Sequence, residues 1–129
     1  MADNQTKVLL VEDDASVRQP LQKFLEIHHF HVQTADSVDG ALDLVHQFRP
    51  EAAIVDLRLA KGNGRDVVVS MPPDVPVIIF SGVPSESSEL ERLRPHTRLI
   101  VKPFSLVMLV ETLEEMLRAS PGYKAHAPS

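Results

Sequence analysis

The stretch Ala-Ala-Ile-Val-Asp at residues 52–56 is an apolar run that ends on a carboxylate. Three other apolar runs also end on polar or charged groups: residues 8–11 before Glu12-Asp13-Asp14, residues 75–80 before Ser81-Gly82, and residues 99–101 before Lys102-Pro103. Short, nearly continuous apolar runs are typical of strands that are covered on both faces of a parallel sheet. The four runs therefore predict four such strands.

Segments with helical periodicity separate these runs. The helices are expected at residues 17–25, 38–45, 65–70, 85–94 and 109–117. Residues 31–35 alternate between polar and apolar side chains, which favours an edge strand. Five strands alternating with five helices predict an α/β fold, a three-layer αβα sandwich. The expected sheet is flavodoxin-like, five-stranded and parallel, with strand order 2-1-3-4-5.

The ends of three helices carry a sequence signal of their own. Asp14 is placed to cap the first helix and Ser85 to cap the fourth, because short polar side chains accept hydrogen bonds from free N–H groups there. The third helix should be short, because residues 67–69 are three valines and Met-Pro-Pro at residues 71–73 stops it.

Composition places the chain among ordinary soluble domains. Its 129 residues are 43% apolar, and its net charge of −5 gives no reason to expect binding to nucleic acid or to an anionic membrane. The absence of cysteine excludes disulfides and thiolate metal sites. The polar first residues exclude a secretory signal, and no apolar stretch approaches the ~20 residues of a membrane span. We expect a cytoplasmic protein.

One folded domain is expected over residues 1–119, with residues 120–129 forming a tail or linker that contains Pro121, Gly122 and Pro128. No basic helix-turn-helix domain follows Ala119, so this chain is not expected to bind DNA itself. Both a free-standing protein and a piece of a longer one fit this pattern.

The polar groups at the four strand ends should meet at one edge of the sheet, where ligands bind in open α/β sheets. Carboxylates packed together repel and raise one another's pKa, and a hard divalent cation with oxygen ligands removes that penalty. A hydroxyl and an ammonium can neutralise the oxygens of a phosphoryl group. The edge therefore predicts a site for a divalent cation and a phosphoryl group, although Asp14 alone is better explained as a helix cap.

These residues, taken together and in this order, resemble the receiver domain of two-component response regulators such as the chemotaxis regulator. The resemblance covers about residues 6–119. It is carried by the acidic cluster at residues 12–14, Asp56, Gly64, Ser81-Gly82 and Lys102-Pro103.

The resemblance implies that Asp56 accepts a phosphoryl group from a sensor histidine kinase or a phosphotransfer protein. Asp13 and Asp56 would ligate Mg²⁺ together with the backbone carbonyl of Arg58, and Glu12 would act through a metal-bound water. Ser81 and Lys102 would bind the phosphoryl oxygens, and the Lys102-Pro103 bond would be cis. Such a domain promotes its own phosphorylation and dephosphorylation and is not a turnover enzyme.

The chain departs from the family pattern at the positions that carry the signal outward. Leu99 stands where an aromatic ring is common, which puts an aromatic switch in doubt. Residues 94–97 replace the usual turn before the last strand, and the third helix is stunted. We hypothesise that bulky Arg58 shields the acyl phosphate from water, in a position that in this family tunes hydrolysis together with Val83.

Two alternatives remain at this point. A pseudo-receiver would use the same fold as a phosphorylation-independent interaction module, and Leu99 keeps this reading open. A haloacid-dehalogenase-type phosphatase also uses a strand-end aspartate, but it wants a second aspartate where Arg58 stands. Nothing in the sequence identifies the pathway or the effector, and a homodimer through the fourth helix, fifth strand and fifth helix is implied by the resemblance alone.

Overall fold

A computed structural model describes residues 5–82 and 88–120 of the chain. Its elements alternate strictly between strand and helix. In chain order they are β1 (Thr6–Val11), α1 (Ala15–Ile27), β2 (Phe30–Ala35), α2 (Val38–Gln47), β3 (Ala52–Asp56), α3 (Gly64–Ser70), β4 (Val77–Ser81), α4 (Ser88–Leu93), β5 (Thr97–Val101) and α5 (Leu106–Ala119).

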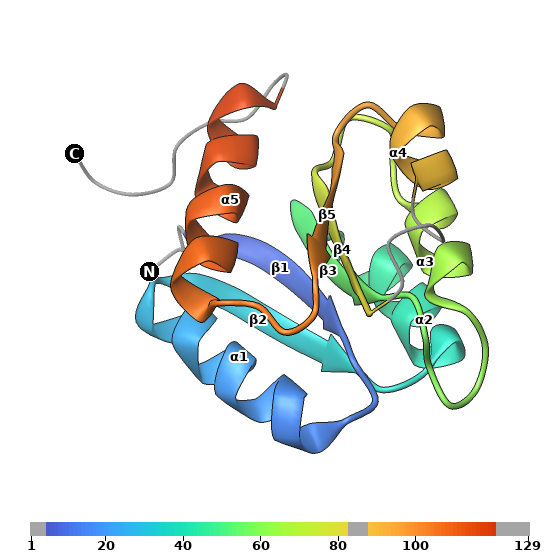
Figure 1. Ribbon diagram of the computed structural model, residues 1–129, viewed down its shortest axis with the longest axis horizontal. Coiled ribbons are helices and arrows are strands. Elements are labelled where there is room, and N and C mark those ends of the chain that lie inside the picture. The colour runs from blue at the N-terminus through green and yellow to red at the C-terminus, as the bar shows by residue number, and fades with distance from the viewer. Residues whose placement is uncertain (1–4, 83–87, 121–129) are drawn as a thin grey trace.

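The five strands form one parallel sheet in the order β2-β1-β3-β4-β5. Helices α1 and α5 cover one face, and α2, α3 and α4 cover the other (Figure 1). The predicted three-layer sandwich and its strand order are therefore confirmed. Within the described ranges, no helix combines the length and the apolarity needed to cross a membrane.

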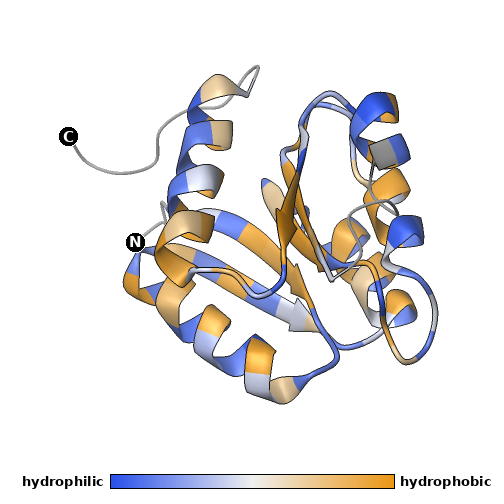
Figure 2. Cartoon of the chain, in the orientation of Figure 1, coloured by the Kyte–Doolittle hydropathy of each residue, from blue (hydrophilic) through white to orange (hydrophobic). Residues whose placement is uncertain are grey.

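The period-two geometry of the strands divides the core into two clusters, one on each face of the sheet. In β1, Val8 and Leu10 face the cluster under α1 and α5, whereas Leu9 and Val11 face the cluster under α2, α3 and α4. All four are fully buried. Figure 2 shows the same division, with apolar strands between helices that are polar on their outer sides.

The starts of two strands differ from the predicted ones. Strand β4 begins at Val77, because Pro76 has no N–H to give to the ladder, although its carbonyl accepts from Ala53. Strand β5 begins at Thr97, two residues before the expected start. The third helix is seven residues long, as short as expected.

The sequence predicted the cap of α1 but not the cap of α3. The predicted cap Asp14 accepts a hydrogen bond from the Ser16 N–H at 2.9 Å. Asn63 caps α3 by accepting from the Arg65 N–H at 2.8 Å, a cap that the sequence did not signal because Asn63 lies in a glycine-rich loop. The predicted cap Ser85 lies outside the described residues.

Candidate functional site

Three carboxylates meet at the carboxyl edge of the sheet. Asp56 is the last residue of β3, and Glu12 follows β1 directly. Both side chains are buried, at 3% and 1% exposure, and Asp13 is half-buried beside them. One oxygen from each of the three lies within 4.8 Å of the others. The parallel register alone brings the two strand ends together.

Lys102 places its ammonium against this cluster. Its Nζ donates to Asp56 Oδ2 at 2.8 Å and to Glu12 Oε1 at 3.4 Å. Its backbone N–H donates to the Ser81 carbonyl at 3.0 Å, which continues the pairing of β4 with β5. The Lys102-Pro103 peptide bond is cis, as expected. Lys102, which directly follows β5, therefore bridges the two buried carboxylates.

Burial and charge shift the protonation of two of these groups. Burial is the main reason why the pKa of Glu12 rises to about 7, and the charge of Asp56 adds to it against a backbone hydrogen bond from Asp14. Burial opposes the charge on Lys102, but its hydrogen bond to Asp56 and the nearby carboxylates outweigh it and raise its pKa. The site thus holds more negative charge than the single ammonium cancels.

The loop after β3 closes the site through main-chain contacts. The Arg58 N–H donates to Asp56 Oδ1 at 3.0 Å, and the Ala60 N–H donates to Asp13 Oδ2 at 2.6 Å. The loop returns so closely that a Cβ on Gly64 would lie 2.2 Å from the Asp56 carbonyl oxygen. Glycine is therefore required at residue 64 by contact with the site, a reason that the motif alone did not supply.

Ser81 ends β4 and is buried at the same edge, next to β3 in the sheet order. The role of its hydroxyl stays a prediction, as does the role of the Arg58 carbonyl. The sequence did not single out Arg18, whose Nη1 donates to the Glu12 carbonyl at 2.8 Å. Helix α1 also carries Lys23, and no sequence signal separates Arg18 from a solvated cation.

The donor set fits a hard divalent cation. Among the described residues, Glu12, Asp13 and Asp56 form the one group of acidic or histidine side chains close enough to hold a metal. Carboxylate oxygens are the ligands that Mg²⁺ takes, usually one or two of them with water completing its shell. A cation there would also lower the cost of ionising Glu12. Of the histidines, His28, His29 and His46 are exposed and His31 and His96 are half-buried, whereas His126 lies outside the described residues.

The site opens onto a hollow of about 830 Å³ between the loop after β3 and the start of α2. Its charged lining residues are mostly acidic: Asp13, Asp36, Asp39 and Asp66, with one cation, Lys61. A cation reaching Asp13 from this side would pass through a region of negative potential.

Comparison with known proteins agrees with this geometry. A family model described as the response regulator receiver domain matches residues 8–114. The chain is 31% identical over 119 residues to a probable transcriptional regulator, ycf27, of Guillardia theta, and 28% identical over 128 residues to the response regulator MprA of a Mycobacterium species. These alignments cover 90% and 95% of this chain but 47% and 56% of the relatives. The chain thus spans about half the length of the curated relatives it matches.

Solved structures show the same fold. The chemotaxis protein CheY4 of Vibrio cholerae superposes with a TM-score of 0.77 at 25% identity, covering 87% of this chain and 98% of that one. The receiver domain of NtrX from Brucella abortus gives a TM-score of 0.78 at 24% identity, covering 88% and 99%.

Proposed function

The chain belongs to the response regulator receiver family, and from this premise we propose that Asp56 accepts a phosphoryl group from a sensor histidine kinase or a phosphotransfer protein. Receiver domains are signalling modules of two-component systems and not turnover enzymes. The observation that carries the proposal is the Lys102 ammonium 2.8 Å from Asp56, beside three carboxylates within 4.8 Å. Asp56 thus has an ammonium and two further carboxylates beside it, the charge arrangement that a phosphoryl acceptor with a bound cation needs.

The residues divide the work of phosphoryl transfer. A carboxylate oxygen of Asp56 attacks phosphorus as the bond to the donor's leaving group breaks, and in-line placement is needed. Lys102 and the Ser81 hydroxyl would then bind phosphoryl oxygens. Glu12, Asp13, Asp56 and the Arg58 carbonyl would hold Mg²⁺, which supplies charge neutralisation when it is bound. Arg58 and Ala60 hold the acidic groups in place through their N–H groups.

The product would act as a switch. An aspartyl phosphate adds up to about two negative charges and new acceptor oxygens next to the end of β4 and the start of the loop after β5. Ser81 and Lys102 would move toward those oxygens, and this movement would bias a two-state rearrangement of α4 and β5. Phosphorylation would then control a partner protein that binds only one of the two arrangements.

The direct test is incubation with acetyl phosphate and Mg²⁺ followed by intact-mass spectrometry. We expect a gain of one phosphoryl group that is absent without Mg²⁺ and absent in Asp56→Asn. Asp36→Asn is the matched control, because Asp36 lies on the acidic hollow outside the carboxylate cluster, and it should be phosphorylated normally. An unmodified wild-type protein would refute the proposal.

A second candidate function is the pseudo-receiver, a module that binds its partner without phosphorylation. Leu99 favours it, because a half-buried aliphatic side chain there packs into the core cluster under α4 and offers no ring to switch. Unmodified wild-type protein that also fails to bind Mg²⁺ in calorimetry would select this function.

We further propose that Arg58 lengthens the life of the acyl phosphate. The residue follows Asp56 by two positions and is exposed at the mouth of the site, where its bulk would obstruct an attacking water. Arg58→Ala should therefore shorten the half-life of phosphorylated protein several-fold, measured by loss of the phosphoryl mass after removal of the donor. An unchanged half-life would sink this idea; Val83, its predicted counterpart, lies outside the described residues.

The partners beyond the kinase depend on the whole protein. Because relatives extend to about twice the matched length, we propose that an output domain or a separate effector receives the signal from a domain of residues 1–119, with residues 120–129 as tail or linker. A homodimer through α4, β5 and α5 is supported by exposed apolar side chains there, Val101, Val107 and Met108. Localisation in the cytoplasm, where histidine kinases phosphorylate their targets, is part of the same proposal.

A further inference from the structure

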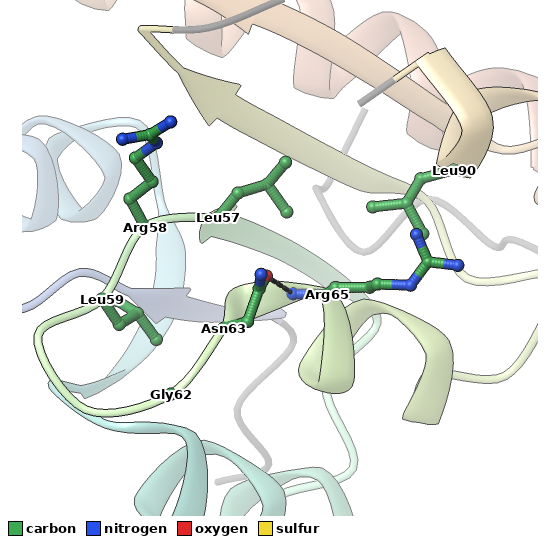
Figure 3. A pocket seen from close by; sticks show the side chains of 7 residues that line it. All are labelled: Leu57, Arg58, Leu59, Gly62, Asn63, Arg65 and Leu90. Carbon is green, nitrogen blue, oxygen red and sulfur yellow. Dashed lines mark hydrogen bonds between the residues drawn. The ribbon is translucent and has the colours of Figure 1, made fainter. Parts of the chain in front are cut away.

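A hollow of about 600 Å³ lies between the loop after β3, α3 and α4 (Figure 3). Three leucines, two arginines and one amide line it: Leu57, Leu59, Leu90, Arg58, Arg65 and Asn63. Both charged lining residues are basic, although the chain as a whole carries a net charge of −5. The acidic hollow on the other side of the same loop has the opposite sign. The arginine side chains of this hollow therefore favour an anionic ligand.

Arg65 already holds a carboxylate at this hollow. Its Nη2 lies 2.7 Å from Glu89 Oε1, and the hydrogen bond and charge of Arg65 lower the pKa of Glu89. Its backbone is fixed, because the Arg65 N–H donates to the capping Asn63, the dashed contact in Figure 3. The Arg65 guanidinium therefore reaches the Glu89 carboxylate from the first turn of α3, whose backbone is held by the Asn63 cap.

The internal ion pair is easily exchanged. The side chains of Arg65 and Glu89 are 40% and 55% exposed, and exposed ion pairs contribute little to stability. A carboxylate from outside could replace Glu89 at small cost. Buried Leu90 lies next to that guanidinium, and half-buried Leu59 lies on the loop after β3 at the other end of the hollow (Figure 3).

We propose that this hollow binds an acidic, amphipathic peptide segment of a partner protein, whose carboxylate replaces Glu89 on Arg65 and whose apolar side chain packs against Leu59. We choose an acidic ligand because the charged lining residues are arginines. The ion pair between Arg65 and Glu89 is the contact that a carboxylate of the ligand would form in its place. The hollow is distinct from the carboxylate cluster at the sheet edge. Binding there needs neither Mg²⁺ nor a phosphoryl donor.

The test uses unphosphorylated full chain, a chelator, and a short fluorescein-labelled peptide in which glutamate alternates with leucine and phenylalanine. Fluorescence anisotropy measures its affinity, and the matched peptide with glutamine in place of glutamate is the ligand control. Arg65→Gln should weaken the glutamate peptide about five-fold, and Glu89→Gln should strengthen it by a similar factor. Arg92→Gln is the matched protein control, because Arg92 is an exposed arginine of α4 that does not line the hollow.

Equal affinity for the two peptides, or an affinity that Arg65→Gln leaves unchanged, would overturn the proposal. So would self-association that Arg65→Gln abolishes, since the ligand would then be a second copy, whose Ile27 is 70% exposed next to Glu26. Arg65→Lys, which keeps the charge, should retain most of the binding and so separates a lost contact from a misfolded α3. Because no phosphorylation is involved, failure here leaves the phosphoacceptor proposal intact.

Discussion

The carboxylate cluster at the ends of β1 and β3 and helix α4 are held by different forces. Glu12 and Asp56 are carried by β1 and β3, whose apolar side chains are fully buried. Helix α4 has six residues, of which Leu90 is buried and Leu93 is 66% exposed. A rigid sheet fixes the geometry of the chemistry, whereas a weakly packed helix can change position at small cost.

Polar contacts provide most of the remaining attachment of α4. The Leu99 N–H donates to Glu91 Oε2 at 3.3 Å, which joins the helix to β5. Buried Arg94 donates from Nη1 to Thr97 Oγ1 at 3.2 Å and from Nη2 to the Pro72 carbonyl. The C-terminal end of the helix is therefore anchored more firmly than its body, which makes that end the natural pivot of a rearrangement.

The largest expected effect comes from removing the apolar anchor of α4. Leu90→Ala should reduce the local stability of residues 88–94 by about 3 kcal/mol, as is typical when a buried leucine is truncated. Hydrogen exchange should then rise about 100-fold in α4 and change little in β1 and β3. Leu93→Ala, at an exposed position of the same helix, is the control and should change exchange little. An equal loss of protection from hydrogen exchange in α4 and in the sheet would contradict the claim that the two regions differ in stability.

The acidic site should make the metal-free protein less stable at neutral pH. Between pH 4.5 and about 7, native Glu12 keeps a proton that the unfolded chain has lost. The free energy of unfolding therefore falls as pH rises through that window, by about 2 to 3 kcal/mol, and levels off above it. Glu12→Gln should remove this decline in chelator-treated protein, as measured by urea unfolding at several pH values.

Magnesium gives a second readout of the same effect. Adding it at pH 7.5 should stabilise wild-type protein more than Glu12→Gln, because part of the gain comes from offsetting the charge of Glu12. If the free energy of unfolding changed with pH in the same way in wild-type protein and in Glu12→Gln, this account of the site would be contradicted.

The smallest effect is expected for the link between α4 and β5. Glu91→Ala should cost under about 1 kcal/mol, the net value of one hydrogen bond near the surface. Its signature is local: the Leu99 amide should exchange faster, while core amides stay protected. Glu111→Ala on α5 is the matched control. An unchanged Leu99 amide would show that Glu91 does not hold the strand.

The sequence predicted which side chains meet at the sheet edge better than it predicted the contacts of α4, and the reason is physical. Apolar runs ending on Glu12, Asp56 and Lys102 define strands and register, and parallel register brings their ends together without further information. The contacts of α4 depend on side chains distant in sequence, such as Arg65 with Glu89. Gly64 belongs to the motif, but the reason for a glycine there, its close approach to the Asp56 carbonyl, depends on how the loop folds back and is not visible in the sequence.

The central claim is that Asp56, and neither of the neighbouring acids, takes the phosphoryl group. Borohydride reduction of protein phosphorylated with acetyl phosphate and Mg²⁺ converts an aspartyl phosphate to homoserine, which peptide sequencing by mass spectrometry locates. We predict homoserine at residue 56 alone. Homoserine at residue 13, a reduced glutamate at residue 12, or no reduced residue at all would contradict the account.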